Sequence, residues 1–242
     1  MERKTEKRSV KEWLTWIAVL LVVSSLTWMS VLFKTRSLSA NLQQTVPSEM
    51  QTKSSQNTFM SKKILCVIDM QNDFIDGALG TKEAQAIVAN VAELIKNWEG
   101  PIYATRDTHQ PDYLQTREGR LLPVVHCVQG TDGWEIRQEI EEELLKKQAV
   151  IINKPTFGSY DLMNELSELL IGDEYESLSE KDIDITFVGL CTDICVVSNT
   201  LLFKNLYPEA EVNVIENCCA GVTPESHQAA LTTMKMCQVN IK

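Results

Sequence analysis

From residue 64 onward, short runs of consecutive apolar residues alternate with longer segments in which apolar residues recur every three or four positions. The short runs predict buried strands and the longer segments predict amphipathic helices. The predicted strands are 64–69, 102–105, 149–152, 185–189, 212–215 and 238–241, and the predicted helices are 84–98, 134–147, 160–170, 193–205 and 224–237. Apolar strands that alternate with helices are typical of a parallel sheet covered on both faces. We therefore expect an α/β fold, a three-layer αβα sandwich with a parallel sheet of about six strands.

Residues 13–33 form a longer apolar run ahead of this region and carry no charged side chain. As a helix rising about 1.5 Å per residue, the run would reach roughly 30 Å, the thickness of a bilayer core. Basic residues are more numerous before the run than closely after it, so the positive-inside rule places the N-terminus in the cytoplasm. We therefore predict a basic leader at 1–36 whose transmembrane-type helix at 13–33 anchors the chain in a membrane by a single N-terminal span.

Residues 37–61 are rich in Ser, Gln, Thr and Asn and lack apolar periodicity, which is typical of a flexible linker. The predicted organisation is thus leader, linker and one globular domain at 62–242. Two alternatives stay open for the leader. Small residues at 37–40 would suit the cleavage of a secretory signal peptide. The segment that starts at Met60 also resembles the start of a cytoplasmic enzyme, which would make the leader a misassigned start or a fused segment.

Composition narrows the classes of partner. The 242 residues are 44% hydrophobic, enough for one sizeable core but not for two large domains. Residues 60–242 hold 15 Lys and Arg against 29 Asp and Glu, a net charge of −14 in a chain whose total is −10. Such an acidic domain argues against nucleic acid as a partner. All seven cysteines lie in this domain, and their odd number and spacing indicate a reducing compartment and no disulfide framework.

Four chemically active side chains follow predicted strands: Asp69, Asp107, Lys154 and Cys195. Because ligands bind beyond the carboxyl ends of parallel strands, we expect these side chains to meet. Cys195 would stand in the first turn of a helix, where free N–H groups favour a thiolate, and Lys154 would depress its pKa further. Asp69 could take the thiol proton and deliver it to a leaving amine. The alternatives are a buried inert cysteine, a solvated lysine and a turn-capping aspartate.

A second set combines carboxylates with two of the chain's three histidines: Asp107, His109, Glu118 and His126. Two imidazoles and two carboxylates suit Zn²⁺, Fe²⁺ or Mn²⁺ with room left for water. We therefore expect a divalent transition metal here, with zinc as the first choice and iron or manganese as alternatives. The alternative is that these residues bind no metal, with His126 packed under a loop and Glu118 exposed to solvent.

Five motifs occur in the order and spacing of one enzyme family. They are VIDMQNDF at 67–74, RDTH at 106–109, HC at 126–127, NKPTFGSY at 153–160 and GLCTDICV at 189–196. Together they resemble the nicotinamidases and related isochorismatase-like cysteine hydrolases. The resemblance covers residues 60–242, and five motifs in order are far more specific than any one of them. It implies an isochorismatase-like fold and a catalytic triad of Asp69, Lys154 and Cys195.

The same resemblance implies amide hydrolysis through a thioester on Cys195, which for nicotinamide would yield nicotinate and ammonia. Backbone N–H groups of Cys191 and Cys195 would stabilise the oxyanion, with a cis peptide bond just before Cys191. The residues that would line the substrate pocket are Phe74, Phe157 and Leu190. Pro123 stands where many relatives carry a tryptophan that stacks on nicotinamide, a departure that bears on the substrate and not on the reaction type.

For the metal, the resemblance implies that Asp107, His109 and His126 are ligands. Glu118 takes the place of a further histidine, as in some bacterial relatives. A metal held there would bind the ring nitrogen of nicotinamide and could activate the hydrolytic water.

Three rival functions stay open. Vinyl-ether cleavage of the isochorismatase type needs no cysteine, so Cys195 argues against it. A relative that cleaves carbamoyl or ureide bonds keeps the triad but generally lacks the paired histidines. A membrane-tethered, non-catalytic acidic scaffold would give the triad residues no reason to converge. We assign no function to His227 and leave homo-oligomerisation open.

Overall fold

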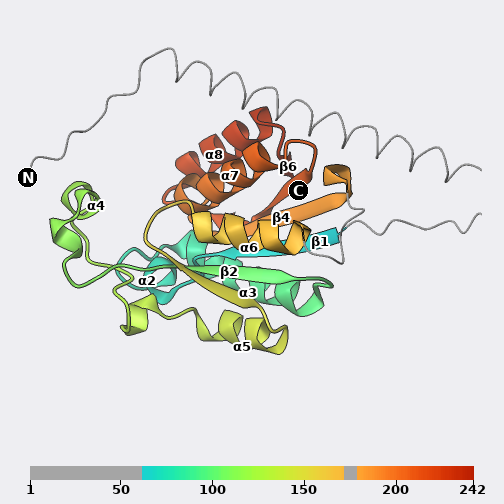
Figure 1. Cartoon of the computed structure of the whole chain (residues 1–242). Coiled ribbons are helices and arrows are strands. Elements are labelled where there is room, and N and C mark those ends of the chain that lie inside the picture. The colour runs from blue at the N-terminus through green and yellow to red at the C-terminus, as the bar shows by residue number, and fades with distance from the viewer. Residues whose placement is uncertain (1–61, 172–178) are drawn as a thin grey trace, which may run out of the picture. The chain divides into compact units, whose positions relative to one another are not determined.

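The computed structural model describes residues 62–171 and 179–242, which form a six-stranded parallel sheet (Figure 1). All neighbouring strands pair in parallel. The strands are β1 (Lys62–Ile68), β2 (Ile102–Asp107), β3 (Val150–Lys154), β4 (Ile183–Leu190), β5 (Glu211–Ala220) and β6 (Asn240–Ile241). Their order across the sheet is β3-β2-β1-β4-β5-β6. The expected parallel sheet of about six strands is confirmed.

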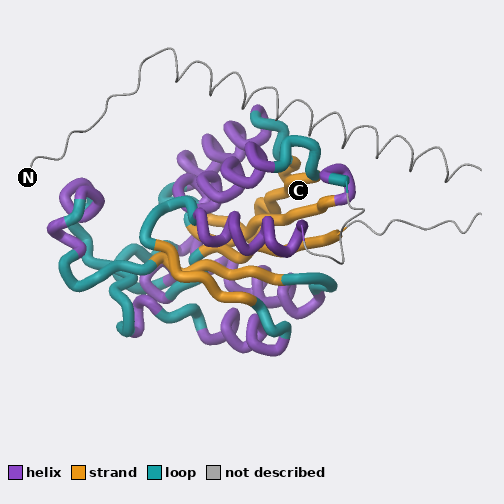
Figure 2. Tube along the Cα trace, viewed as in Figure 1, coloured by secondary structure: helices purple, strands orange, loops and turns teal. Residues whose placement is uncertain are grey.

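Helices cover both faces of this sheet and complete the three-layer αβα arrangement (Figures 1 and 2). The chain travels from β1 to β3 in one direction and from β4 to β6 in the other. Right-handed crossovers therefore place the first pair of helices on one face and the later three on the other. The helices of the first face are α3 (Lys82–Asn97) and α5 (Gln138–Lys146), and those of the second are α6 (Tyr160–Ile171), α7 (Val197–Leu206) and α8 (Pro224–Met236).

The strands β1 and β4 form the centre of the sheet. They pair over seven residues, from Lys62 with Ile183 to Ile68 with Gly189. Residues 64–68 are at most 1% exposed, as expected for a strand buried on both faces. The two strands lead to opposite halves of the sheet, so their carboxyl ends mark the switch point at which α/β folds form a ligand crevice.

Two predicted helices begin differently in the structure. The helix predicted at 134–147 starts only at Gln138, because Trp134 belongs to a 3₁₀ turn at Asp132–Trp134. The Trp134 indole N–H donates to Thr108 Oγ1 at 2.9 Å, and Arg106 stacks 3.8 Å from the ring centroid. These tertiary contacts override the helical pattern. The helix predicted at 193–205 starts with a π-helical turn, Thr192–Val196, ahead of α7.

Two short helices between the predicted elements were not expected. They are α2 (Asn72–Ile75) and α4 (Arg117–Leu121). Four or five residues are too few to show helical periodicity in a sequence. The segment that carries α4 reaches away from the rest of the domain, at the left of Figure 1.

No helix among residues 62–171 and 179–242 is long and apolar enough to cross a membrane. The leader at 1–36, with its predicted span at 13–33, and the linker at 37–61 lie outside the described residues. The membrane anchor therefore stays a prediction.

We expect Gly189→Ala to destabilise the domain strongly. Gly189 has φ +115°, and a Cβ there would collide with the carbonyl oxygen of Ile68 on β1. Gly130 is the matched control, since it also has a positive φ, +82°, but nothing lies within 4 Å of a Cβ built on it. Urea unfolding followed by tryptophan fluorescence should show a loss of about 3 kcal/mol or more for Gly189→Ala and about 1 kcal/mol for Gly130→Ala. Equal losses would contradict the close contact of β1 and β4.

Candidate active site

The three predicted catalytic side chains meet beyond the carboxyl ends of the strands. Lys154, the last residue of β3, places Nζ 2.7 Å from Asp69 Oδ2 and 3.4 Å from Cys195 Sγ. Asp69 is 0% exposed, Lys154 1% and Cys195 4%. A lysine is seldom buried this deeply unless it is paired with an opposite charge. The structure thus brings together a thiol, a carboxylate and an ammonium that stand far apart in the sequence.

The carboxylate and the ammonium are each held by further hydrogen bonds. Asp69 takes φ 48°, a backbone conformation that residues other than glycine rarely adopt. Thr105 on β2 supports it, because its hydroxyl donates to Asp69 Oδ1 at 2.7 Å and its carbonyl accepts from Asp69 N at 3.2 Å. Lys154 Nζ donates to Thr156 O at 3.1 Å and lies 3.5 Å from Asp107 Oδ1. The ion pair is therefore fixed from both sides.

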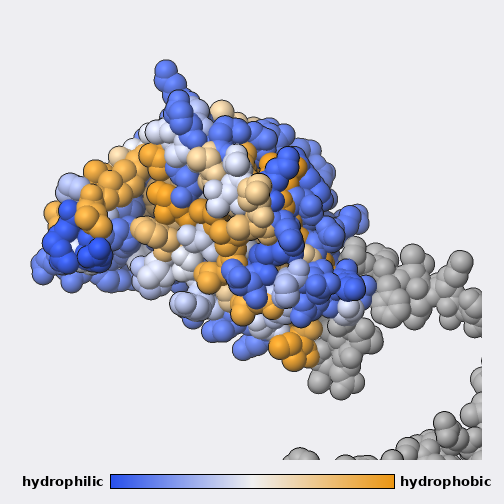
Figure 3. Space-filling view, turned by 90° about the horizontal axis from the view of Figure 1, so that it is seen from above, coloured by the Kyte–Doolittle hydropathy of each residue, from blue (hydrophilic) through white to orange (hydrophobic). Residues whose placement is uncertain are grey.

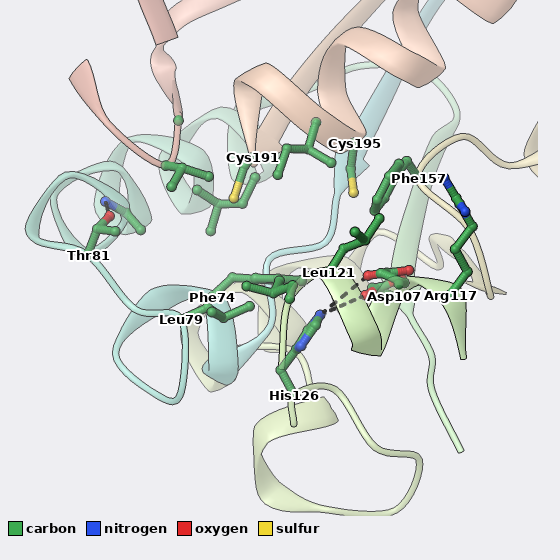
Figure 4. Close-up of a pocket in the computed structure, with 17 residues that line it drawn as sticks. Phe74, Leu79, Thr81, Asp107, Arg117, Leu121, His126, Phe157, Cys191 and Cys195 are labelled. Carbon is green, nitrogen blue, oxygen red and sulfur yellow. Dashed lines mark hydrogen bonds and ion pairs between the residues drawn. The ribbon is translucent and has the colours of Figure 1, made fainter. Parts of the chain in front are cut away.

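Cys195 lies in the π-helical turn that leads from β4 into α7. Val196 N donates to Cys191 O at 3.1 Å, the five-residue step that defines such a turn. Asn199, fully buried in α7, donates from Nδ2 to Cys195 O at 2.8 Å and to Phe157 O at 3.1 Å. Single π-helical turns frequently occur at functional sites. In Figure 4, the side chains of Cys191 and Cys195 lie on the same side of one cavity.

The protonation of Cys195 differs from the sequence-based expectation. Burial raises the pKa of the thiol well above its ordinary value, and the charge of Asp69 raises it further, against the lowering effect of Lys154. The expected thiolate with a depressed pKa is therefore wrong for the resting site. The physical reason is that Lys154 already compensates the charge of Asp69, so a thiolate would be a second buried anion.

Asp69 and Lys154 are shifted by the same burial. Burial raises the pKa of Asp69, and Lys154 opposes this shift. Burial lowers the pKa of Lys154, but the charges of Asp69, Cys195 and Asp107 outweigh it and keep that pKa above its ordinary value. One ammonium thus faces two acids, Asp69 and Cys195, and burial raises the pKa of both.

The four predicted metal ligands form a second cluster beside the triad. His109 Nε2 lies 2.9 Å from Asp107 Oδ2 and 3.6 Å from Glu118 Oε1. His126 Nε2 lies 3.7 Å from Asp107 Oδ2 and 4.0 Å from Glu118 Oε1. One ligand atom each from Asp107, His109 and His126 falls within 4.8 Å of the others. The structure therefore gathers all four residues.

The imidazoles of this cluster fit a metal ion. His126 Nδ1 donates to Val124 O at 2.8 Å, which leaves the lone pair on Nε2 facing the cluster. His109 Nε2 is buried and, although it is 2.9 Å from Asp107 Oδ2, lacks hydrogen-bond geometry. Gln71 holds the backbone of Asp107, accepting from its N at 2.7 Å and donating to its O at 2.8 Å. A shared divalent cation would satisfy these convergent nitrogen and carboxylate atoms.

A cavity of about 570 Å³ opens between the triad and the cluster (Figure 4). Cys195 and three of the cluster residues line it: Asp107, Glu118 and His126. All four residues predicted to bind substrate or the oxyanion line it as well: Phe74, Phe157, Leu190 and Cys191. The peptide bond Leu190–Cys191 is cis, as the resemblance implied.

Several supporting residues were not predicted. Gln71 and Thr192 lie inside the quoted motifs, so motif membership was a signal for them. Nothing in the sequence pointed to Thr105 or Asn199. His227 received no function, yet its Nδ1 shares a 2.8 Å hydrogen bond with Thr192 Oγ1 in the turn that carries Cys195. It therefore braces this turn from α8.

Comparison with known proteins agrees with this geometry. The model of the family described as the isochorismatase domain matches residues 63–241, most of the chain. The chain belongs to the isochorismatase family. Within this family, the nicotinamidase of Escherichia coli (strain K12) is 26% identical over 201 residues, covering 73% of this chain and 92% of that protein.

Two solved structures of family members resemble the whole domain. The pyrazinamidase of Pyrococcus horikoshii in complex with zinc has a TM-score of 0.59 and 29% identity, covering 75% of this chain and 98% of that one. The pyrazinamidase/nicotinamidase of Streptococcus mutans UA159 has a TM-score of 0.63 and 25% identity, covering 75% of this chain and 100% of that one.

We expect His126→Ala to lose zinc that the wild-type chain retains. His126 Nε2 faces the cluster, so its removal takes away one of the converging ligand atoms. After incubation with zinc and exhaustive dialysis, elemental analysis should show at least tenfold weaker zinc retention in this variant. The matched control is His227→Ala, because His227 lies outside the cluster and should leave zinc retention unchanged. Equal zinc content in both variants and the wild type would contradict the site.

Proposed function

We propose that this member of the isochorismatase family hydrolyses a small primary carboxamide, with nicotinamide converted into nicotinate and ammonia. One observation carries the proposal: Lys154 Nζ contacts both Asp69 and Cys195, and Cys195 lines a cavity large enough for such a substrate. The nicotinamidase and pyrazinamidase relatives support amide hydrolysis as the reaction type.

In the first step, Cys195 Sγ attacks the carboxamide carbon while the thiol proton passes to Asp69. Lys154 keeps its proton throughout, and its charge balances the one negative charge that the site carries at each stage. The buried site therefore never holds two uncompensated anions. A thiol with a raised pKa can act in this way because its proton leaves as the carbon–sulfur bond forms.

In the second step, the tetrahedral intermediate breaks its carbon–nitrogen bond, and Asp69 gives its proton to the nitrogen, which leaves as ammonia. Water then attacks the thioester carbon and loses a proton to Asp69. The carbon–sulfur bond breaks, the acid is released and the proton returns to the thiol. Each proton that Asp69 accepts is thus returned within the cycle.

The oxyanion of the intermediate would be stabilised by the backbone N–H groups of Cys191 and Cys195. Both residues line the cavity, which supports this role. Phe74, Phe157 and Leu190 would contact the body of the substrate.

Asp107, His109 and His126, with Glu118 beside them, would hold a divalent metal, and zinc is the first choice because one structural relative is a zinc complex. When bound, such an ion supplies a Lewis acid that can hold a ring nitrogen of the substrate. The chain's own part is to hold the ligands with Gln71 and the carbonyl of Val124.

Two of the rival functions can be compared with the family and with the site. The non-catalytic scaffold is wrong, since the family and its nicotinamidase members indicate an amide-hydrolysing enzyme. Cleavage of a carbamoyl or ureide bond would use the same triad. The paired histidines of the cluster, of which His126 lines the cavity, favour the carboxamide over it.

We expect Cys195→Ala to abolish ammonia release from nicotinamide, because it removes the thiol that lies 3.4 Å from Lys154 Nζ and would form the thioester. The full chain should lose activity by at least a thousandfold, and its stability should fall by only about 1 kcal/mol. The matched control is Cys237→Ala, since Cys237 is an exposed thiol outside the cavity and its removal should leave activity unchanged. Comparable ammonia release by Cys195→Ala would refute the nucleophile.

Asp69 must be ionised to accept the thiol proton, so kcat/KM should fall as the pH drops through the pKa of Asp69. Burial raises that pKa, and the Thr105 hydroxyl lowers it by donating to the carboxylate. Thr105→Val should therefore move the acid limb of the pH profile to higher pH by about 0.5 to 1 unit. Thr200→Val is the control, because Thr200 is also buried but its Oγ1 has no hydrogen-bond partner. An unmoved limb in Thr105→Val would argue against Asp69 as the base.

A further inference from the structure

The cavity extends well beyond the triad. Figure 4 shows Cys195 and Phe157 on one side of it and Leu79 and Thr81 on the other, with Cys191 between them. The half around Leu79 and Thr81, here called the distal half, is formed by the loop before α3, the first turn of α3 and the residues after β5. Besides the labelled Leu79 and Thr81, the cavity lining includes Ala84 from α3 and Gly221 and Val222 from the segment after β5, and Gly221 also lies beside Glu83 and Ile87 of α3.

Among the described residues, the lining of the distal half includes no charged side chain. The charged lining residues, Asp107, Arg117 and Glu118, come from the end of β2 and from α4, on the side of the metal cluster. Thr81 offers the one side-chain hydroxyl, and this oxygen already accepts from Ala84 N at 3.0 Å to cap α3. An apolar group placed there would displace water without leaving a charge desolvated.

The cavity is also larger than a substrate with a single six-membered ring would fill. About 570 Å³ corresponds to roughly twenty water molecules at about 30 Å³ each and lies in the range that holds drug-sized ligands. A six-membered ring with its carboxamide at Cys195 would leave much of this space to water. Apolar lining that stays wet contributes nothing to transition-state binding.

Exposed apolar side chains at the rim of the cavity also favour an apolar ligand. Val222 is 52% exposed and Leu121 75% exposed, and both line the cavity. In Figure 3, hydrophobic residues gather on the arm at the left and on the adjoining surface. Apolar side chains at the mouth of a pocket become buried when an apolar ligand enters.

We propose that the preferred substrate is a primary carboxamide with an apolar extension, whose carboxamide lies at Cys195 and whose extension fills the distal half between Leu79 and Val222. This inference rests on the proposed function and assigns the substrate class of the same site. Val222 is then a specificity-determining residue for the extension and takes no part in the chemistry.

The test follows ammonia release by the full chain from nicotinamide, benzamide and benzamides that carry ethyl, butyl or hexyl chains. The value of kcat/KM should rise about threefold to fourfold for each buried methylene, and so at least tenfold from benzamide to the best alkyl derivative. Val222→Asp places a carboxylate in the distal half and should erase this rise, so that kcat/KM no longer increases from benzamide to the alkyl derivatives. The matched control is Val150→Asp, an exposed valine at the start of β3 that should preserve the rise.

The outcomes separate this inference from the function on which it rests. Hydrolysis of nicotinamide or benzamide with no gain on alkylation would overturn the apolar extension and leave amide hydrolysis standing. A gain that persists in Val222→Asp would also overturn the placement in the distal half. Absence of ammonia release from every amide would overturn the proposed function and this inference together.

Discussion

The buried ion pair between Lys154 and Asp69 is the interaction on which the rest of the site depends. The two charged atoms are 2.7 Å apart, and neither side chain is exposed to solvent. The pair joins the ends of β1 and β3 across β2, where the Thr105 hydroxyl also bonds to the carboxylate. Because removing either partner would leave an uncompensated buried charge, the three strand ends must keep their register for the domain to be stable.

The same pair sets the chemistry of the thiol. Burial and the charge of Asp69 raise the pKa of Cys195, so in the proposed mechanism the proton leaves only as the attack on the carbonyl carbon begins. A helix terminus and a nearby lysine are not enough to make a resting thiolate when the lysine is already paired. The charged lining residues Asp107, Arg117 and Glu118 come from the end of β2 and from α4, so the proposed function would assign reaction and substrate selection to separate surfaces of the cavity.

Much of the fold follows from local pattern. The apolar runs of β1 and β4 identify strands buried on both faces, and the alternation with helices requires parallel crossovers. The pattern failed where a tertiary contact decided the backbone. The apolar pattern of residues 134–147 predicts a helix that starts at Trp134. The indole of Trp134 instead bonds to Thr108, and Arg106 stacks on its ring. Short α4 had no periodicity to reveal it, although it supplies one wall of the cavity.

The sequence by itself determined which groups are available: a thiol, an ammonium and carboxylates at the ends of strands, and two histidines in one short span. It could do so because residue type and strand position are local properties. Only the tertiary structure decided that Lys154 pairs with Asp69 and that burial raises the pKa of Cys195, and that Asn199 and His227 bond to the turn that carries Cys195. Charge compensation, burial and cavity volume arise from distances between segments far apart in the chain, and no local pattern contains those distances.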